Sequence, residues 1–152
     1  MSKRETAKRT DTVRYLKWNN DIIGIIDETN AVTFTEPRYN KVVTLYTHGA
    51  SLWTPEQFTE FLTERTVSRD RRDIERILFR CGLSHYDVLR ICEITRGIHP
   101  KDLLWIANDE KETLDVVMTD VFSSVFLQRI DLTGDSIDTP EGYNIKRYGV
   151  FD

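Results

Sequence analysis

Residues 13–34 read VRYLKWNNDIIGIIDETNAVTF, and this stretch decides the fold. It contains three segments with the alternation or β-branched content of strands: Val13–Trp18, Ile22–Ile26 and Ala31–Thr35. Asn19-Asn20-Asp21 and Glu28-Thr29-Asn30 separate these segments. Asn and Asp tolerate the left-handed backbone of tight turns. The stretch therefore predicts an antiparallel meander at the start of the domain.

The next apolar segment, Val42–Thr47, carries Val, Leu and Tyr residues, and it predicts a fourth strand. The middle of the chain has helical periodicity instead. Thr54 followed by Pro55 and Gln57 is a strong helix start signal. Two further helices are predicted, one over residues 69–81 that ends at Gly82 and one that Ser84 caps and Gly97 ends.

Pro100 and Asp102 predict the start of a short helical segment whose Leu103, Leu104 and Ile106 enter the core together with Trp105. Glu112–Phe126 predicts a last helix, and two later segments predict short strands: Ile130–Leu132 and Ile145–Phe151. The expected fold class is therefore α+β, with an N-terminal antiparallel meander, a helical middle and a short C-terminal β segment. Residues 1–12 lack apolar periodicity and predict a mobile arm, and residues 13–152 predict a single domain.

Composition limits the class of protein. The chain has 152 residues, of which 39% are hydrophobic and 30% charged, as in a globular domain. No apolar run approaches the roughly 20 residues that span a bilayer. The first twelve residues are too polar for a secretory signal. Cys81 and Cys92 lie in helical patterns and predict buried thiols in a reducing compartment. We therefore expect a cytoplasmic protein without a membrane partner.

Charge is distributed unevenly. The net charge of the whole chain is −4, but residues 1–97 carry an excess of two positive charges and residues 98–152 an excess of six negative charges. Such a split indicates two differently used surfaces.

No catalytic motif is apparent. The three histidines, His48, His85 and His99, lie in separate segments without a paired carboxylate motif. His99 and Asp102 with Asn108 resemble part of a kinase catalytic loop, but the spacing to Asn108 is one residue too long and no D-F-G follows. We therefore predict no catalytic residue, no metal site and no cofactor.

An arginine series is the most unusual local feature, and it consists of Arg65, Arg69, Arg72, Arg76 and Arg80. Steps of four, three, four and four residues place all five on one face if a helix runs unbroken through the region. The series then predicts a contact surface for phosphates or for the acidic side chains of a partner. The alternative is a solvated face on which Glu64, Asp73 and Glu75 pair locally with the arginines.

Two weaker patterns remain. Cys81-Gly82-Leu83-Ser84 between two helices permits a helix-turn-helix, but Asp87 and Glu93 on the second helix would face nucleic acid poorly. In Thr139-Pro-Glu-Gly-Tyr-Asn-Ile-Lys146, Gly142 permits close backbone approach to a ligand. Lys146 is placed to reach a phosphate.

Four parts of the chain share a pattern with one known family: Val13–Phe34, Ile77–Asp87, Thr95-Arg-Gly97 with Asp102, and the segment from Gly134 to Lys146. In these parts the sequence resembles HipA-like serine/threonine kinases. The resemblance implies a β-rich N-terminal subdomain, then helices, then a nucleotide loop to which Thr139, Gly142, Asn144 and Lys146 correspond. It also implies that the chain ends before the ATP-contacting lysine and the catalytic and metal-binding residues of the family.

Three functions follow as hypotheses. The first is a non-catalytic regulatory module that resembles the N-terminal part of HipA-like kinases and binds a separately encoded kinase core or another protein. The second is a small inhibitor from a phage or mobile element, similar to an anti-CRISPR protein, whose acidic residues 98–152 mimic phosphates. The third is a nucleic-acid binder that uses the arginine face.

Overall fold

The computed structural model describes residues 13–99, 101–122 and Leu132, and within them the α+β class is confirmed. A five-stranded antiparallel sheet has the order β4-β3-β2-β1-β5. Its strands are β1 (Arg14–Trp18), β2 (Asp21–Ile26), β3 (Val32–Phe34), β4 (Leu52–Trp53) and β5 (Leu104–Ala107). The strand that follows the helical middle is β5. The predicted arm over residues 1–12 and the predicted strand at 145–151 lie outside the described residues, as does the segment 130–132 except for Leu132.

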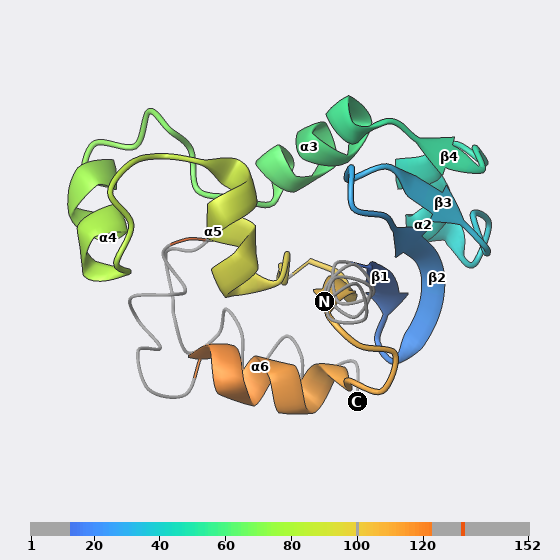
Figure 1. The fold of residues 1–152 in the computed structure, drawn as a ribbon. Helices are drawn as coiled ribbons and strands as arrows, with labels where there is room; N and C mark the ends of the chain where they lie inside the picture. Colours follow the sequence, from blue (N-terminus) through green and yellow to red (C-terminus); the bar gives the residue numbers. More distant parts are fainter. Residues whose placement is uncertain (1–12, 100, 123–131, 133–152) are drawn as a thin grey trace, which may run out of the picture.

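Five helices connect and cover these strands: α2 (Lys41–Thr47), α3 (Pro55–Glu64), α4 (Ile74–Arg80), α5 (Val88–Thr95) and α6 (Leu114–Phe122). Figure 1 shows α3 and α6 on opposite sides of α5, and α4 at the end of the molecule away from β3 and β4. Helix α4 is therefore a projecting element that lies far from most of the sheet.

The N-terminal meander forms as predicted. Asn19 and Asn30 take the left-handed conformation in its two turns, with φ of 55° and 75°. Gly24 is the one residue of β2 without a side chain, and the reason is space. A Cβ atom there would lie 3.2 Å from Cγ1 of Val32 and 3.3 Å from Cδ1 of Phe34 on the neighbouring strand.

Helix α2 corrects the prediction of a strand over residues 42–47. The Asn40 side chain accepts a hydrogen bond from the amide of Val43 and caps the helix. Val43 and Thr47, one helical turn apart, then face the interior. The cap and this four-residue spacing outweigh the β-propensity of the segment.

Strand β5 corrects the prediction of a helix after Pro100. All four of its residues are buried because both faces of the strand are covered. Leu104 and Ile106 pack with the helices α3 and α5 on one face, whereas Trp105 and Ala107 pack with Leu114 and Val117 of the α6 side on the other. The predicted burial of Trp105 is confirmed, since its exposed fraction is 1%.

The predicted helix starts are partly confirmed. Thr54 and Gln57 form a reciprocal capping box at α3. Asp87, and not Ser84, caps α5 by accepting a hydrogen bond from the amide of Leu89.

A third buried cluster holds α4 and α5 together, and it consists of Val67, Ile77, Leu78, Leu83, Ile91 and Leu132.

Candidate functional site

The arginine series does not lie on one helix. Helix α3 ends at Glu64, and α4 begins only at Ile74. The condition of one unbroken helix through the five arginines is therefore not met, and the helix predicted from residue 69 begins five residues later. The series is divided between a buried residue and an exposed group. Arg65 is buried, whereas Arg69, Arg72, Arg76 and Arg80 are exposed.

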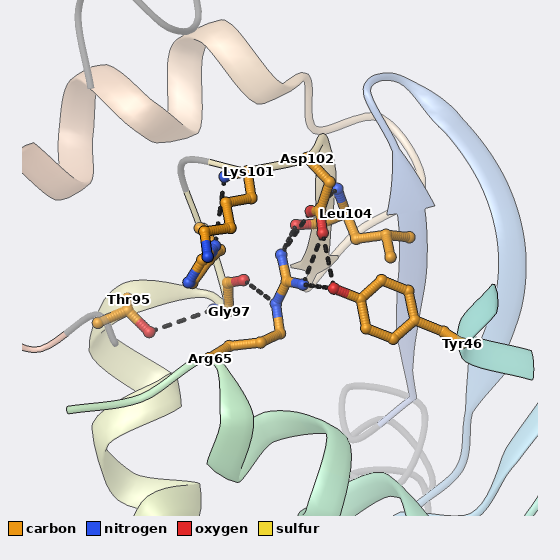
Figure 2. Close-up of polar contacts among 8 residues, drawn as sticks. Tyr46, Arg65, Thr95, Gly97, Lys101, Asp102 and Leu104 are labelled. Atoms are coloured by element: carbon orange, nitrogen blue, oxygen red, sulfur yellow. Dashed lines mark hydrogen bonds and ion pairs between the residues drawn. The ribbon is translucent and has the colours of Figure 1, made fainter. Parts of the chain in front are cut away.

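Arg65 lies inside the molecule at the end of α3 (Figure 2). Its guanidinium forms a bidentate pair with Asp102, with N–O distances of 2.7 and 2.9 Å. Its Nε donates to the carbonyl of Gly97 at 2.8 Å, and one terminal nitrogen donates to the carbonyl of Leu104 at 3.0 Å. Arg65 therefore joins α3, the end of α5 and β5 in one network, and it is not available to a partner.

Asp102 is the anion of this network. Burial alone would raise the pKa of its carboxyl group. The charge and hydrogen bonds of Arg65, together with the amide of Leu104, outweigh that effect and hold the pKa below its usual value. The Tyr46 hydroxyl also donates to Asp102, at 3.1 Å. The pair therefore links α3, the segment after α5 and β5 through buried hydrogen bonds.

The outer edge of β5, the side that faces away from β1, is closed by two arginines. Arg65 donates to the carbonyl of Leu104, and the Arg96 guanidinium donates to the carbonyl of Ile106 at 3.1 Å. The amide of Leu104 donates to Asp102, and the amide of Ile106 donates to the carbonyl of Arg96 at 2.7 Å. All four outward backbone groups of Leu104 and Ile106 are thus hydrogen-bonded.

Helix α4 presents the most exposed large apolar side chain of the described residues. Phe79 has an exposed fraction of 80%, whereas Ile77 and Leu78 of the same helix are buried at 1% and 4%. At 100° per residue, Arg76 and Arg80 lie on the same outward face as Phe79. We use the name α4 face for Phe79, Arg76 and Arg80 together with the exposed Arg72, which precedes the helix.

The α4 face carries positive charge that is only partly neutralised. Asp73 accepts from Arg71 and from Arg76, each at 2.9 Å. Arg72 and Arg80 form no ion pair with any residue in the described part of the chain. Their guanidiniums are therefore available for anionic groups of a partner.

Two cavities adjoin this region and share Arg69 and Tyr86 as lining residues. One cavity, of about 600 Å³, is also lined by Ile74, Leu78 and Phe79. The other, of about 710 Å³, extends toward the threonines of α3. The Arg69 guanidinium lies 4.6 Å from the centre of the Tyr86 ring, and the Tyr86 hydroxyl donates to the carbonyl of Val67 at 2.7 Å. These contacts fix the positions of Arg69 and Tyr86 between the two cavities.

Sequence reasoning missed Phe79. Its spacing separates it from the apolar stripe of Ile74, Ile77 and Leu78, so it is an apolar residue on a polar face. That mismatch was the available signal for a contact residue.

The other predicted features have separate outcomes. Thr139, Gly142, Asn144 and Lys146 lie outside the described residues, so the nucleotide loop stays a prediction. Cys92 is buried as predicted, and burial raises the pKa of its thiol, whereas Cys81 is half-buried. Within residues 13–99 and 101–122, no three His, Cys, Asp or Glu side chains gather as a metal site.

Comparison with known proteins found no matching family, no matching curated protein and no matching solved structure. Among the described helices, none has the length and apolar character needed to cross a membrane.

Proposed function

We propose that this chain is a non-catalytic protein-interaction module that binds a partner protein through the α4 face. The observation that carries the proposal is Phe79, an aromatic side chain left 80% exposed among arginines on a projecting helix. Aromatic residues and arginine are the residue types enriched at the energetic centres of protein interfaces.

The surroundings of Phe79 distinguish it from the other exposed apolar residues. Leu45 is exposed by 72% and Val116 by 58%, but neither lines a described cavity. Phe79 borders a cavity that the half-buried Ile74 also lines, so a partner covering Phe79 would reach a second apolar side chain. Full burial of one such side chain contributes about 1.5–3 kcal/mol.

The charge of the region indicates an acidic partner. Residues 68–80 carry five arginines and three acidic residues, and Asp73 is occupied by local pairing. An apolar recess rimmed by carboxylates would complement Phe79 together with Arg72 and Arg80. The resemblance to the N-terminal part of HipA-like kinases suggests a separately encoded kinase core as this partner. A host or defence protein is the partner that the inhibitor hypothesis implies.

The test is site-specific photo-crosslinking. The photoreactive residue p-benzoylphenylalanine replaces Phe79 in one variant and Leu45 in a control variant of similar exposure. The cells of origin are irradiated, and the adducts are identified by mass spectrometry. We expect one protein to be crosslinked from position 79 and not from position 45.

The identified protein is then purified and titrated with the wild-type chain, Phe79→Ser, Arg80→Gln and Leu45→Ser. We expect Phe79→Ser to weaken binding by about tenfold or more, because truncated interface centres commonly cost 2 kcal/mol. Leu45→Ser should leave binding unchanged. Equal affinity of all four proteins would overturn the proposal. A labelled DNA duplex that binds with a steep salt dependence through the same arginines would favour the nucleic-acid hypothesis instead.

A further inference from the structure

A cleft of about 640 Å³ lies between the sheet and α5, away from the α4 face. Arg14 of β1, Asn30 of the turn between β2 and β3, and Glu93 of α5 are among its lining residues. The apolar part of the lining consists of Leu89, Cys92 and Ile106. Six of the nine lining residues are polar or charged, and the volume lies within the range of small-molecule sites.

Arg14 is the unusual residue of this cleft. Its half-buried guanidinium donates a hydrogen bond to the side-chain oxygen of Asn30, and it forms no ion pair within the described part of the chain. Burial lowers the pKa of Arg14, and the nearby carboxylate of Glu93 acts in the opposite direction. A partly desolvated cation is unfavourable without a counter-charge. Among the described residues, Arg14 therefore has a carboxylate nearby but none in ion-pair contact, and a bound carboxylate could supply that contact.

The other charged residues of the cleft are either paired or exposed to solvent. Arg96 is already held by Glu112 in a bidentate pair at 2.8 and 2.9 Å. Glu93 pairs only loosely with Arg90, at 3.6 Å, and both side chains of that pair are largely exposed. Glu28 is exposed at the rim. Arg14 and Glu93 thus face one cleft, close enough to interact electrostatically, but without meeting in an ion pair.

From this juxtaposition we infer that the cleft binds a small zwitterion of the amino-acid type. Its carboxylate would accept hydrogen bonds from Arg14, and its ammonium group would donate to Glu93. Its apolar side chain would cover Leu89, Cys92 and Ile106. A simple anion would meet repulsion from Glu93 and Glu28, and a simple cation would leave Arg14 without a counter-charge. A molecule carrying both charges would pair with the guanidinium of Arg14 and with the carboxylate of Glu93.

The test uses three matched compounds and the full chain. L-Leucine, its deaminated counterpart 4-methylpentanoate and its decarboxylated counterpart isopentylamine are titrated separately into ¹⁵N-labelled protein. L-Phenylalanine, 3-phenylpropanoate and phenethylamine form a second set of three compounds, which carry a larger apolar side chain. We expect the amino acids to shift the backbone amide signals of Leu89, Cys92 and Glu93, and each single-charge analogue to bind at least about tenfold more weakly.

Two variants test the residues, and two matched variants serve as controls. Arg14→Gln and Glu93→Gln should each weaken amino-acid binding by about tenfold or more, as expected for the loss of one charge-assisted hydrogen bond. Arg38→Gln and Glu60→Gln remove the same charges outside the cleft and outside the α4 face, and they should leave binding unchanged.

Absence of shifts in the cleft with either amino acid at tens of millimolar would overturn the inference. Equal binding of the carboxylates alone would also overturn it, because the cleft would then be a plain anion site. Both results are independent of the α4 face, since none of its residues lines this cleft.

Discussion

Arg65 has a different role in the structure from the one that the sequence predicts. In the sequence it opens a series that predicts a contact surface, but in the structure it is 3% exposed and paired with Asp102. Replacing Arg65 with Met would leave a buried carboxylate without its cation. We expect the free energy of unfolding to fall by about 3–5 kcal/mol, which urea denaturation would measure.

A double variant separates the charge effect from the packing effect. In Arg65→Met/Asp102→Leu no buried charge remains unpaired, so the double variant should be more stable than Arg65→Met, although the carbonyls of Gly97 and Leu104 and the amide of Leu104 lose their side-chain partners. A double variant that is as unstable as the sum of the two single changes would contradict this account.

Asp102 also determines part of the response to acid. Because its pKa is lower in the folded protein than in the unfolded chain, the unfolded chain binds a proton first as the pH falls below about 4. The contribution of Asp102 to the free energy of unfolding should therefore not vary with pH above about pH 5, and it should decrease as the pH falls below that value. Urea midpoints between pH 2.5 and 6 would measure this decrease. In Asp102→Asn the decrease should be smaller by up to about 1.4 kcal/mol per pH unit, and identical slopes would contradict the prediction.

At the scale of elements, α4 is predicted to tolerate the loss of its outward charges. Its arginines are exposed, and the pair between Arg76 and Asp73 is largely solvated. Exposed ion pairs contribute about 0–1 kcal/mol each. We expect the triple variant Arg72→Gln/Arg76→Gln/Arg80→Gln to change the free energy of unfolding by less than about 1 kcal/mol in urea denaturation.

The matched control lies on the opposite side of the same helix. Leu78 is 4% exposed in the cluster between α4 and α5, so Leu78→Ala should cost about 2–5 kcal/mol. If the triple arginine variant were destabilised as much as Leu78→Ala, the arginines would be structural and the α4 face would lose its interpretation as a contact surface.

The elements that sequence predicts best are those with a local chemical signal. Two asparagine turns and period-two alternation are sufficient for β1 to β3, and Thr54 with Gln57 is sufficient for the start of α3. The residues of segment 42–47 favour a strand, but Asn40 caps a helix there by accepting a hydrogen bond from the amide of Val43, three residues later. Pro100 resembles a helix start, and this is why the sequence predicts a helix where strand β5 forms. Its uninterrupted apolar run is typical of a strand covered on both faces.

The candidate sites were less accessible to prediction because they depend on contacts between distant residues. Arg65 and Asp102 are separated by 37 positions, and no local pattern links them. The same applies to Arg14 and Glu93, which β1 and α5 bring to one cleft. Four of the five arginines are exposed, but their spacing could not reveal that the chain leaves the helix between Glu64 and Ile74.

At the scale of the whole molecule, Trp105 connects the sheet to the layer formed by α6. It is 1% exposed, packs in the cluster with Leu114 and Val117, and donates its indole N–H to the carbonyl of Asn19. We expect Trp105→Ala to lower the free energy of unfolding by about 3–5 kcal/mol. Amide hydrogen exchange in α6 should accelerate more than exchange in α3. A loss below about 1 kcal/mol in urea denaturation would contradict this role.

The closed outer edge of β5 has a consequence for chains in a crowded solution. An open strand edge is a template onto which another copy can add its own backbone, and repeated addition leads to fibres. Here Arg65 and Arg96 occupy the carbonyls that such a copy would need, and the strand at the other end of the sheet, β4, is only two residues long. The buried arginine that sequence assigned to partner binding therefore acts in the opposite sense, by preventing copies of the chain from joining edge to edge.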